Sequence, residues 1–232
     1  MDLFPLESNP EVLTKFIHVL GVPDNFKLVD VYGLDDEPLS WLPRPVIAFI
    51  LLFPCSEKFY EHCKKEDEEI AKKPPKENNV WFMKQHVSNA CGTIALLHCI
   101  ANNGDRLHLK DGVFKKWLEQ VKDKTPDERG VLLAEGGNDT EAFKLISAHQ
   151  QLAMEGQTEV NPDEKVNHHF IAILEKDGEL YELDGRRQHP VYRGATDKDK
   201  FVHDAAAICK TYMERDSDDI NFTVLALTGS DS

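Results

Sequence analysis

Apolar residues recur with helical spacing near the start of the chain. Positions 12, 13, 16, 17 and 20 are all apolar and fall on one face of a helix. Asn9 can cap such a helix, Pro10 suits its first turn, and Gly21 follows its last apolar residue. The pattern therefore predicts an amphipathic helix over residues 10–20.

Strand-like patterns lie near both ends of the chain, with helical patterns between them. Residues 26–32 and 46–53 have the composition of strands, and the second segment is apolar on both faces, as expected of a central strand. A final strand is predicted over 220–227, after a hairpin over 166–183. The predicted helices lie over 56–73, 89–100, 112–121, 126–134, 143–148 and 199–213. Residues 150–164 are polar and without a period, so they are predicted to form a long exposed loop.

The hairpin places two chemically interesting residues together. Residues 177–178 are Asp-Gly, which favours a two-residue turn, and this turn puts Ile171 opposite Asp184. Side chains two residues apart share a face of a strand, so His169 and Asp184 are predicted to be diagonal neighbours, about 7–8 Å apart between backbones. His168 points to the other face. A change of one residue in the turn would reverse this assignment.

Composition indicates a folded acidic protein. The chain has 232 residues, of which 41% are hydrophobic and 29% are charged, with a formal net charge of −14. Such a charge repels nucleic acid, which we do not expect as a partner. The start of the chain lacks a signal-peptide pattern, and the longest apolar stretch, residues 46–53, is too short to cross a membrane. No linker interrupts the pattern, so we expect one domain over residues 1–232.

The five cysteines are an odd number and contain no C-x-x-C pair, which argues against a disulfide framework or a zinc finger. Reduced thiols fit a protein of the cytoplasm or the nucleus. Cys91 differs from the others because a polar segment runs into an apolar helix at this residue. A helix N-terminus stabilises a thiolate, which is the nucleophilic form of cysteine. The remaining cysteines are interpreted as small core residues: Cys55, Cys63, Cys99 and Cys209.

A cysteine nucleophile needs a base, usually histidine, and the base needs an acceptor that orients it. The hairpin register selects His169 and Asp184 for these roles. Gln85 precedes Cys91 by six residues, so its amide could assist the Cys91 backbone N–H in an oxyanion hole. We find no spacing of metal ligands and no glycine-rich phosphate loop, and therefore expect no metal and no cofactor.

These residues stand in motifs that resemble those of the ubiquitin carboxyl-terminal hydrolases. The motifs are Gln85-x5-Cys91-Gly-Thr, Val166-Asn-His-His169-Phe-Ile and Tyr181-Glu-Leu-Asp184-Gly-Arg. The segments Pro5-Leu-Glu-Ser-Asn-Pro-Glu-Val12 and Glu155-Gly-Gln-Thr-Glu159 resemble the small members of that family, so the likeness extends over the whole chain. By this resemblance Cys91 is the nucleophile, His169 the general base and acid, Asp184 its orienting residue, and Gln85 the oxyanion donor.

The resemblance also implies a fold and a substrate. The fold would be an α/β (α+β), papain-like knotted domain with a central antiparallel sheet flanked by helices. Residues 148–161 would form a crossover loop above the active site, which admits small or unfolded adducts of ubiquitin and excludes bulky ones. The residues expected to contact ubiquitin are Pro5, Leu6, Glu7, Ser8, Asn9, Pro10, Ala153, Met154, Glu155, Gly156, Gln157, Thr158, Asp219, Ile220, Asn221 and Phe222.

Several alternatives stay open. The protein could bind or stabilise ubiquitin with only a minor catalytic role, or it could be a cysteine peptidase or acyltransferase with a general peptide substrate. Nedd8 is an alternative to ubiquitin as the modifier. We expect a monomer of the cytoplasm, and also of the nucleus, whose negative charge attracts the basic tail of ubiquitin.

Overall fold

The computed structural model describes residues 3–72, 79–137, 140–155, 168–216 and 220–230. Its centre is a six-stranded sheet in which every neighbouring pair is antiparallel, in the order β1-β6-β2-β3-β4-β5. The strands are β1 (Phe26–Asp30), β2 (Val46–Pro54), β3 (His168–Lys176), β4 (Glu179–Leu183), β5 (Val191–Ala195) and β6 (Thr223–Gly229). The predicted central antiparallel sheet is therefore confirmed, and β2 lies inside it.

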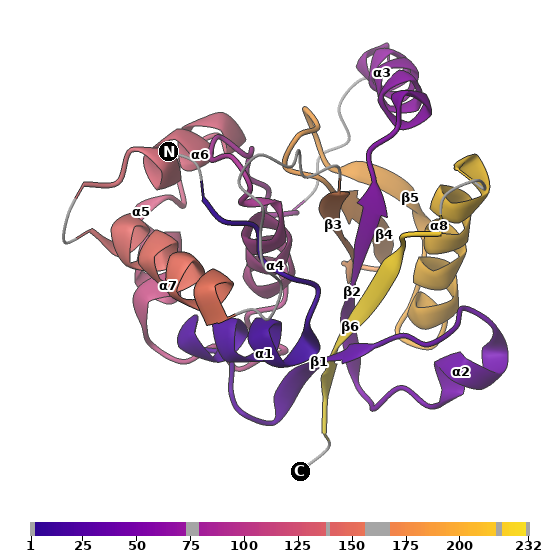
Figure 1. Ribbon diagram of the computed structural model, residues 1–232, viewed down its shortest axis with the longest axis horizontal. Coiled ribbons are helices and arrows are strands. Elements are labelled where there is room, and N and C mark those ends of the chain that lie inside the picture. The colour runs from indigo at the N-terminus through magenta and orange to yellow at the C-terminus, as the bar shows by residue number, and fades with distance from the viewer. Residues whose placement is uncertain (1–2, 73–78, 138–139, 156–167, 217–219, 231–232) are drawn as a thin grey trace.

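Helices cover both faces of this sheet (Figure 1). They are α1 (Pro10–Val19), α2 (Asp36–Ser40), α3 (Glu57–Ala71), α4 (Cys91–Asn102), α5 (Val113–Gln120), α6 (Pro126–Ala134), α7 (Glu141–Glu155) and α8 (Phe201–Arg215). Figure 1 shows α1, α4, α5 and α7 on one side of the sheet and α2 and α8 on the other. Helix α3 stands beyond the end of β2, at the top of that view.

Strand β2 divides the interior into two hydrophobic cores. Ala48 and Ile50 face the core that includes α1, α4 and α7, whereas Phe49, Leu51 and Phe53 face the core that includes α8. Successive side chains point to opposite faces of a strand, so a strand between two helical layers must be apolar at nearly every position. The continuous apolar run in the sequence has this cause.

Local signals in the sequence set the starts of the helices. The Asn9 side chain accepts a hydrogen bond from the backbone N–H of Glu11 at 2.9 Å and caps α1, as predicted. At α6, the Thr125 hydroxyl accepts from the Glu128 backbone while the Glu128 carboxylate accepts from the Thr125 backbone. This reciprocal capping box satisfies two backbone donors that a helix start leaves free.

The predicted hairpin register is confirmed. Ala172 pairs with Leu183 and Lys176 pairs with Glu179, which places residues 177 and 178 alone in the turn. Both turn residues have positive φ, +53° at Asp177 and +79° at Gly178. A two-residue turn with two positive φ values matches the right-handed twist of the strands it connects, and Asp-Gly adopts it at low cost.

Other predictions need correction. Residues 150–155 do not form a loop, because α7 continues to Glu155; its buried residues, which include Leu145, His149 and Leu152, share one face. The rest of the predicted crossover loop lies outside the described residues, and the predicted knot, which depends on the path of the whole chain, stays a prediction. The short elements α2 and β5 were not predicted, and β6 begins at Thr223 rather than at residue 220.

Candidate active site

Cys91 is the first residue of α4. Ala90 precedes the helix and provides no side-chain cap, so backbone N–H groups of the first turn are left for another partner. The close packing of this turn depends on Gly92, where a Cβ atom would lie 3.3 Å from the Phe170 ring and 3.4 Å from Leu6 Cβ. The helix can therefore bring Cys91 against the start of β3, where the residue is buried, with 7% of its surface exposed.

His169 and Asp184 form a short buried hydrogen bond. His169 is the second residue of β3, Asp184 directly follows β4, and the distance from His169 Nε2 to Asp184 Oδ1 is 2.6 Å. The Arg186 backbone N–H donates to the same Oδ1 atom at 2.8 Å. The rings of His169 and Phe53 pack edge to face, at 5.8 Å between centroids. The imidazole is thus held by a carboxylate on one side and an aromatic ring on another.

The other ring nitrogen of His169 is left for the thiol. Nδ1 is buried and forms no hydrogen bond of normal geometry with any of the described residues. Nevertheless, the imidazole and the Cys91 thiol are close enough for each to change the other's ionisation. A thiol, an imidazole and a carboxylate in this order form the arrangement that activates a cysteine nucleophile, and such contacts are often loose before substrate binds.

The charges at the site favour a thiolate and imidazolium pair. Burial by itself would raise the pKa of Cys91, but contact with His169 and the Phe170 backbone N–H lower it below its ordinary value. Burial would lower the pKa of His169, whereas the Asp184 carboxylate and the Cys91 thiol raise it to about 9. The pKa of Asp184, which burial would raise, is lowered by His169 and the Arg186 backbone. All three shifts stabilise charged forms.

The other four cysteines are buried and free, as the sequence predicted for core residues. Burial raises the pKa of Cys63 to about 12 and raises the pKa values of Cys99 and Cys209 further. Burial also raises the pKa of Cys55. Cys91 is the one cysteine whose pKa is lowered, so the local environment distinguishes it from the rest.

Gln85 lies beside the strand that leads to Asp184. Its backbone N–H donates to the Gly185 carbonyl oxygen at 2.8 Å, which joins the segment before α4 to the turn after β4. The Gln85 side-chain Nε2 donates to the Val87 carbonyl oxygen at 3.0 Å, and its buried Oε1 has no hydrogen-bond partner among the described residues. Its role as an oxyanion donor stays a prediction, which would use the second N–H of Nε2 rather than the one bonded to Val87.

The N-terminal segment predicted to contact ubiquitin lies over the start of α4. The Leu3 carbonyl oxygen accepts from Asn89 Nδ2 at 2.9 Å, and the Phe4 carbonyl oxygen accepts from His149 Nε2 at 2.7 Å. Leu6 is buried in the core, while the Asn9 side chain caps α1, so neither side chain is free for a partner. The partly exposed residues of the segment are Pro5, Glu7, Ser8, Asn9 and Pro10.

The other predicted contact residues are divided between two places. Ala153, Met154 and Glu155 form the last turn of α7, and Glu155 is paired with Lys15 of α1 at 3.0 Å. Ile220 is 89% exposed before β6. Asn221 is also exposed, whereas Phe222 is partly buried against the core on the α8 side. Gly156, Gln157, Thr158 and Asp219 lie outside the described residues.

Two neighbours of Asp184 were missed from the sequence. No role was predicted for Gly185, yet a Cβ atom there would lie 2.8 Å from Ile94 Cγ2 and 3.1 Å from Gln85 Cβ. The Arg186 backbone holds the Asp184 carboxylate, as described above. A glycine directly after a candidate acidic residue was the available signal, but only the packing shows what it approaches.

The described residues contain neither a membrane-spanning helix nor a cluster of metal ligands. None of the helices there is long and apolar enough to cross a membrane. Nor do His, Cys, Asp and Glu side chains of those residues form a group of three or more that could hold a metal ion.

Comparisons with known proteins identify the family of the chain. The model of the family "Ubiquitin carboxyl-terminal hydrolase, family 1" matches residues 3–214. A ubiquitin carboxyl-terminal hydrolase of Drosophila melanogaster is 48% identical over 229 residues, covering 97% of each chain. Isozyme L1 of the human enzyme is 42% identical over 228 residues, covering 98% of each chain.

A solved structure shares the fold. The catalytic domain of Trichinella spiralis UCH37, bound to ubiquitin vinyl methyl ester, has a TM-score of 0.71 at 21% identity, covering 99% of this chain and 97% of that one. The predicted family and enzyme class are confirmed by the match of the family model and by these two sequence relatives. The chain belongs to family 1 of the ubiquitin carboxyl-terminal hydrolases.

Proposed function

We propose that this protein is a deubiquitinating thiol hydrolase that releases small or unfolded adducts from the C-terminal glycine of ubiquitin. The observation that carries the proposal is the 2.6 Å bond from His169 to Asp184, with the Cys91 thiol at the start of α4 beside the same imidazole. Family membership supports the hydrolase class, and the names of the sequence relatives support ubiquitin as the modifier.

The proposed mechanism has two stages. The Cys91 thiolate attacks the carbonyl carbon of the ubiquitin C-terminal glycine, and as the C–N bond breaks, His169 gives its proton to the leaving amine. Ubiquitin is then held as a thioester. His169 next takes a proton from water, whose oxygen attacks the thioester carbonyl, and the C–S bond breaks to return the Cys91 thiolate. Asp184 stays ionised throughout and keeps the imidazole oriented.

The start of α4 is suited to the oxyanion that forms in each stage. Backbone N–H groups of a first helical turn without a side-chain cap can donate to developing negative charge, and the helix dipole acts in the same direction. Gln85 is proposed as the second donor, through the N–H of Nε2 that is not bonded to Val87. Removal of one such donor typically costs about 10²–10³ in kcat.

Hydrolysis of a ubiquitin C-terminal fluorogenic amide tests the proposal. The unmodified protein is expected to turn over this substrate, and Cys91→Ala is expected to abolish turnover while ubiquitin binding persists. Cys99→Ala is the matched control, because Cys99 is a buried cysteine of the same helix with a strongly raised pKa. Undiminished hydrolysis by Cys91→Ala would reject the assignment of the nucleophile.

A second experiment addresses the modifier and the alternative role. Ubiquitin and Nedd8, each with a C-terminal vinyl methyl ester, are offered separately, and the labelled residue is mapped by mass spectrometry. Labelling of Cys91 by ubiquitin alone supports the proposal, whereas labelling by Nedd8 alone contradicts the choice of modifier. Tight ubiquitin binding with negligible turnover would instead favour a ubiquitin-binding or stabilising protein.

A further inference from the structure

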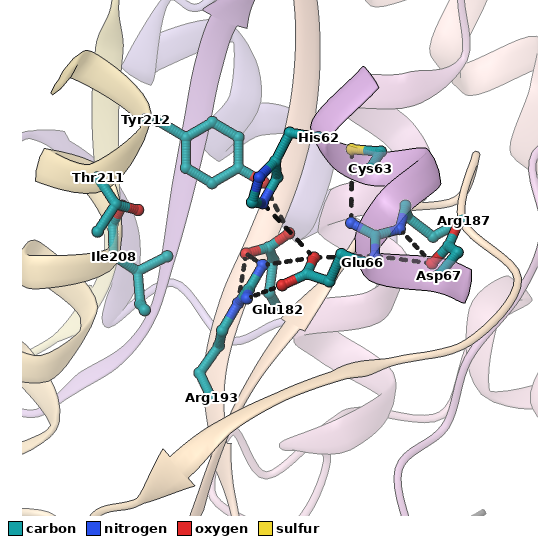
Figure 2. A network of polar contacts seen from close by, with 10 residues as sticks. All are labelled: His62, Cys63, Glu66, Asp67, Glu182, Arg187, Arg193, Ile208, Thr211 and Tyr212. Atoms are coloured by element: carbon teal, nitrogen blue, oxygen red, sulfur yellow. Dashed lines mark hydrogen bonds and ion pairs between the residues drawn. The ribbon is translucent and has the colours of Figure 1, made fainter. Parts of the chain in front are cut away.

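A network of buried and partly buried ion pairs, which includes Glu66, Arg187 and Arg193, is shown in Figure 2. Arg187, whose side chain is 4% exposed, uses every nitrogen of its guanidinium on residues of α3. Nε donates to Asp67 at 2.8 Å, Nη2 to Glu66 at 2.9 Å, and Nη1 to Cys63 Sγ at 3.4 Å. A buried arginine is tolerated when carboxylates balance its charge and every guanidinium nitrogen has a hydrogen-bond partner.

The network continues across the sheet to α8. Glu66 also accepts a hydrogen bond from Arg193 of β5, and Arg193 in turn donates to Glu182 of β4 at 2.9 Å. The second oxygen of Glu182 accepts from the Tyr212 hydroxyl at 2.6 Å. Figure 2 shows these side chains converging on Glu66 and Glu182. Glu182 lies two residues before Asp184, so the network extends along the strand that carries this carboxylate.

Arg187 is also part of the turn that holds Asp184. Its backbone N–H donates to the Asp184 carbonyl oxygen at 2.9 Å, and the Arg186 backbone N–H donates to the Asp184 carboxylate. The turn over residues 184–187 thus has Asp184 at one end and a guanidinium bound to α3 at the other. A shift of Arg187 would be passed directly to the backbone of Asp184.

On the side of α3, the turn is also held by the Arg186 guanidinium, which donates to the Tyr60 hydroxyl at 3.3 Å. A cavity of about 480 Å³ lies there, and its lining includes Phe59, Tyr60, Asp184, Arg186 and Arg187. A turn that borders a cavity gains few packing contacts on that side, so its position depends on its polar contacts. Among the described residues, the ion pairs between this turn and α3 are those of Arg187 with Glu66 and Asp67.

We propose that Arg187 is a positioning residue, which acts through Glu66 and Asp67 to fix the Asp184 carboxylate against His169. The inference rests on the proposed hydrolase function and deepens it. Helix α3 becomes part of the support of the active site, although it contributes no group to the reacting atoms. Displacement of α3 should loosen the hydrogen bond between His169 and Asp184 and reduce the thiolate fraction of Cys91.

The test measures the ionisation of Cys91 separately from hydrolysis. The rate of Cys91 alkylation by iodoacetamide is followed against pH, with the modified peptide identified by mass spectrometry, in Arg187→Met and in the unmodified protein. We expect the alkylation midpoint to rise by about one pH unit in Arg187→Met. For the fluorogenic ubiquitin substrate, kcat should fall about tenfold with KM changed less than about twofold. Arg187→Lys, which keeps the charge but loses the planar fork, should recover part of both effects.

Arg106→Met is the matched control. Arg106 is a partly buried arginine that contacts Glu175, Asn103 and the Val46 carbonyl oxygen, near the turn end of β3 and away from His169. It should lower stability without moving the alkylation midpoint. If Arg187→Met behaves like this control, Arg187 has only a structural role and the proposal is overturned.

A milder variant covers the case in which Arg187→Met does not fold. Asp67 is partly exposed, and Asp67→Asn keeps the size of its side chain. The substitution removes the charge of Asp67 and so weakens its ion pair with Arg187. It should raise the midpoint in the same direction by a smaller amount, and an unchanged midpoint overturns the proposal. A shifted midpoint in a protein that hydrolyses no ubiquitin substrate would instead refute the proposed function and leave the positioning role intact.

Discussion

The backbone N–H of Gln85 donates to the carbonyl oxygen of Gly185 at 2.8 Å, and this bond joins the two chain segments that frame the candidate active site. One segment leads into α4 and Cys91, and the other follows β4 and carries Asp184. The approach is possible because residue 185 has no side chain. Gly185 therefore sets how closely the two segments can lie.

We predict that Gly185→Ala lowers both stability and activity. The new Cβ atom would lie 2.8 Å from Ile94 Cγ2, which is closer than van der Waals contact allows, so the turn or α4 must shift. Overpacking of this kind costs about 1–3 kcal/mol of unfolding free energy. Urea unfolding measures this loss, and we expect kcat to fall further than stability alone explains because the shift displaces Asp184.

Gly112→Ala is the control for this prediction. A Cβ atom at Gly112 would meet nothing within 4 Å, and its φ of 178° is extended backbone that any residue adopts. Gly112 is the N-cap of α5, where alanine is less favourable than glycine, so the change should lower the unfolding free energy by no more than about 1 kcal/mol. Equal effects of the two substitutions would show that the close approach at Gly185 has no special importance.

The stability of the protein should depend on pH through His169. Its pKa is raised to about 9 by Asp184 and Cys91 against the effect of burial, whereas histidine in the unfolded chain has a pKa of about 6.5. Because folding favours the protonated imidazole, His169 contributes its full stabilisation of the folded protein below pH 6.5. This contribution is lost as the pH rises towards 9. In a Cys91→Ala background, which removes the thiolate, the unfolding free energy should fall by about 1–3 kcal/mol across this range.

Asp184→Asn in the same background provides the comparison. The amide can still accept a hydrogen bond but carries no charge, so the protonated imidazole loses its stabilising partner. The fall in unfolding free energy between pH 6.5 and 9 should then nearly disappear in urea titrations. A fall of the same size in both variants would mean that another group titrates.

His149 should connect substrate binding to the catalytic helix. Its Nε2 donates to the Phe4 carbonyl oxygen at 2.7 Å, so its Nδ1 accepts from the Thr93 hydroxyl at 2.6 Å. His149→Leu leaves the buried Thr93 hydroxyl without this partner, at about 1–3 kcal/mol, and also removes the partner of the partly buried Phe4 carbonyl oxygen. We also expect weaker ubiquitin binding by calorimetry, because the predicted contact segment at residues 5–10 loses its anchor. His149→Gln can keep both bonds and should bind nearly normally; equal loss in both variants would count against the anchor.

Ionic strength should affect binding more than chemistry. The chain has a net charge of −14, which attracts a basic protein tail over distances comparable to the Debye length, about 10 Å at 0.1 M salt. Raising sodium chloride from about 0.05 M to 0.5 M should increase KM for the fluorogenic ubiquitin substrate several-fold and leave kcat unchanged. A KM that is insensitive to salt would show that the net charge does not steer the substrate.

The sequence alone determined those features that depend on near neighbours. Asn9 and the pair Thr125 and Glu128 define helix starts because a cap needs only its own first turn. The Asp-Gly turn at 177–178 defined the hairpin register, and the register placed His169 and Asp184 on one face. Cys91 was identified by the change from polar to apolar residues at a helix start.

Only the tertiary structure decided what depends on distant segments. The polar end of α7 is helical because Leu152 and His149 pack into the core, which its composition did not reveal. The close approach at Gly185 and the contacts of Arg187 with α3 join residues that no local pattern relates. Spacing along the chain fixes turns, caps and faces, whereas the partner across a packed interface is chosen by the fold as a whole, through shape and charge that meet only when the sheet and helices assemble.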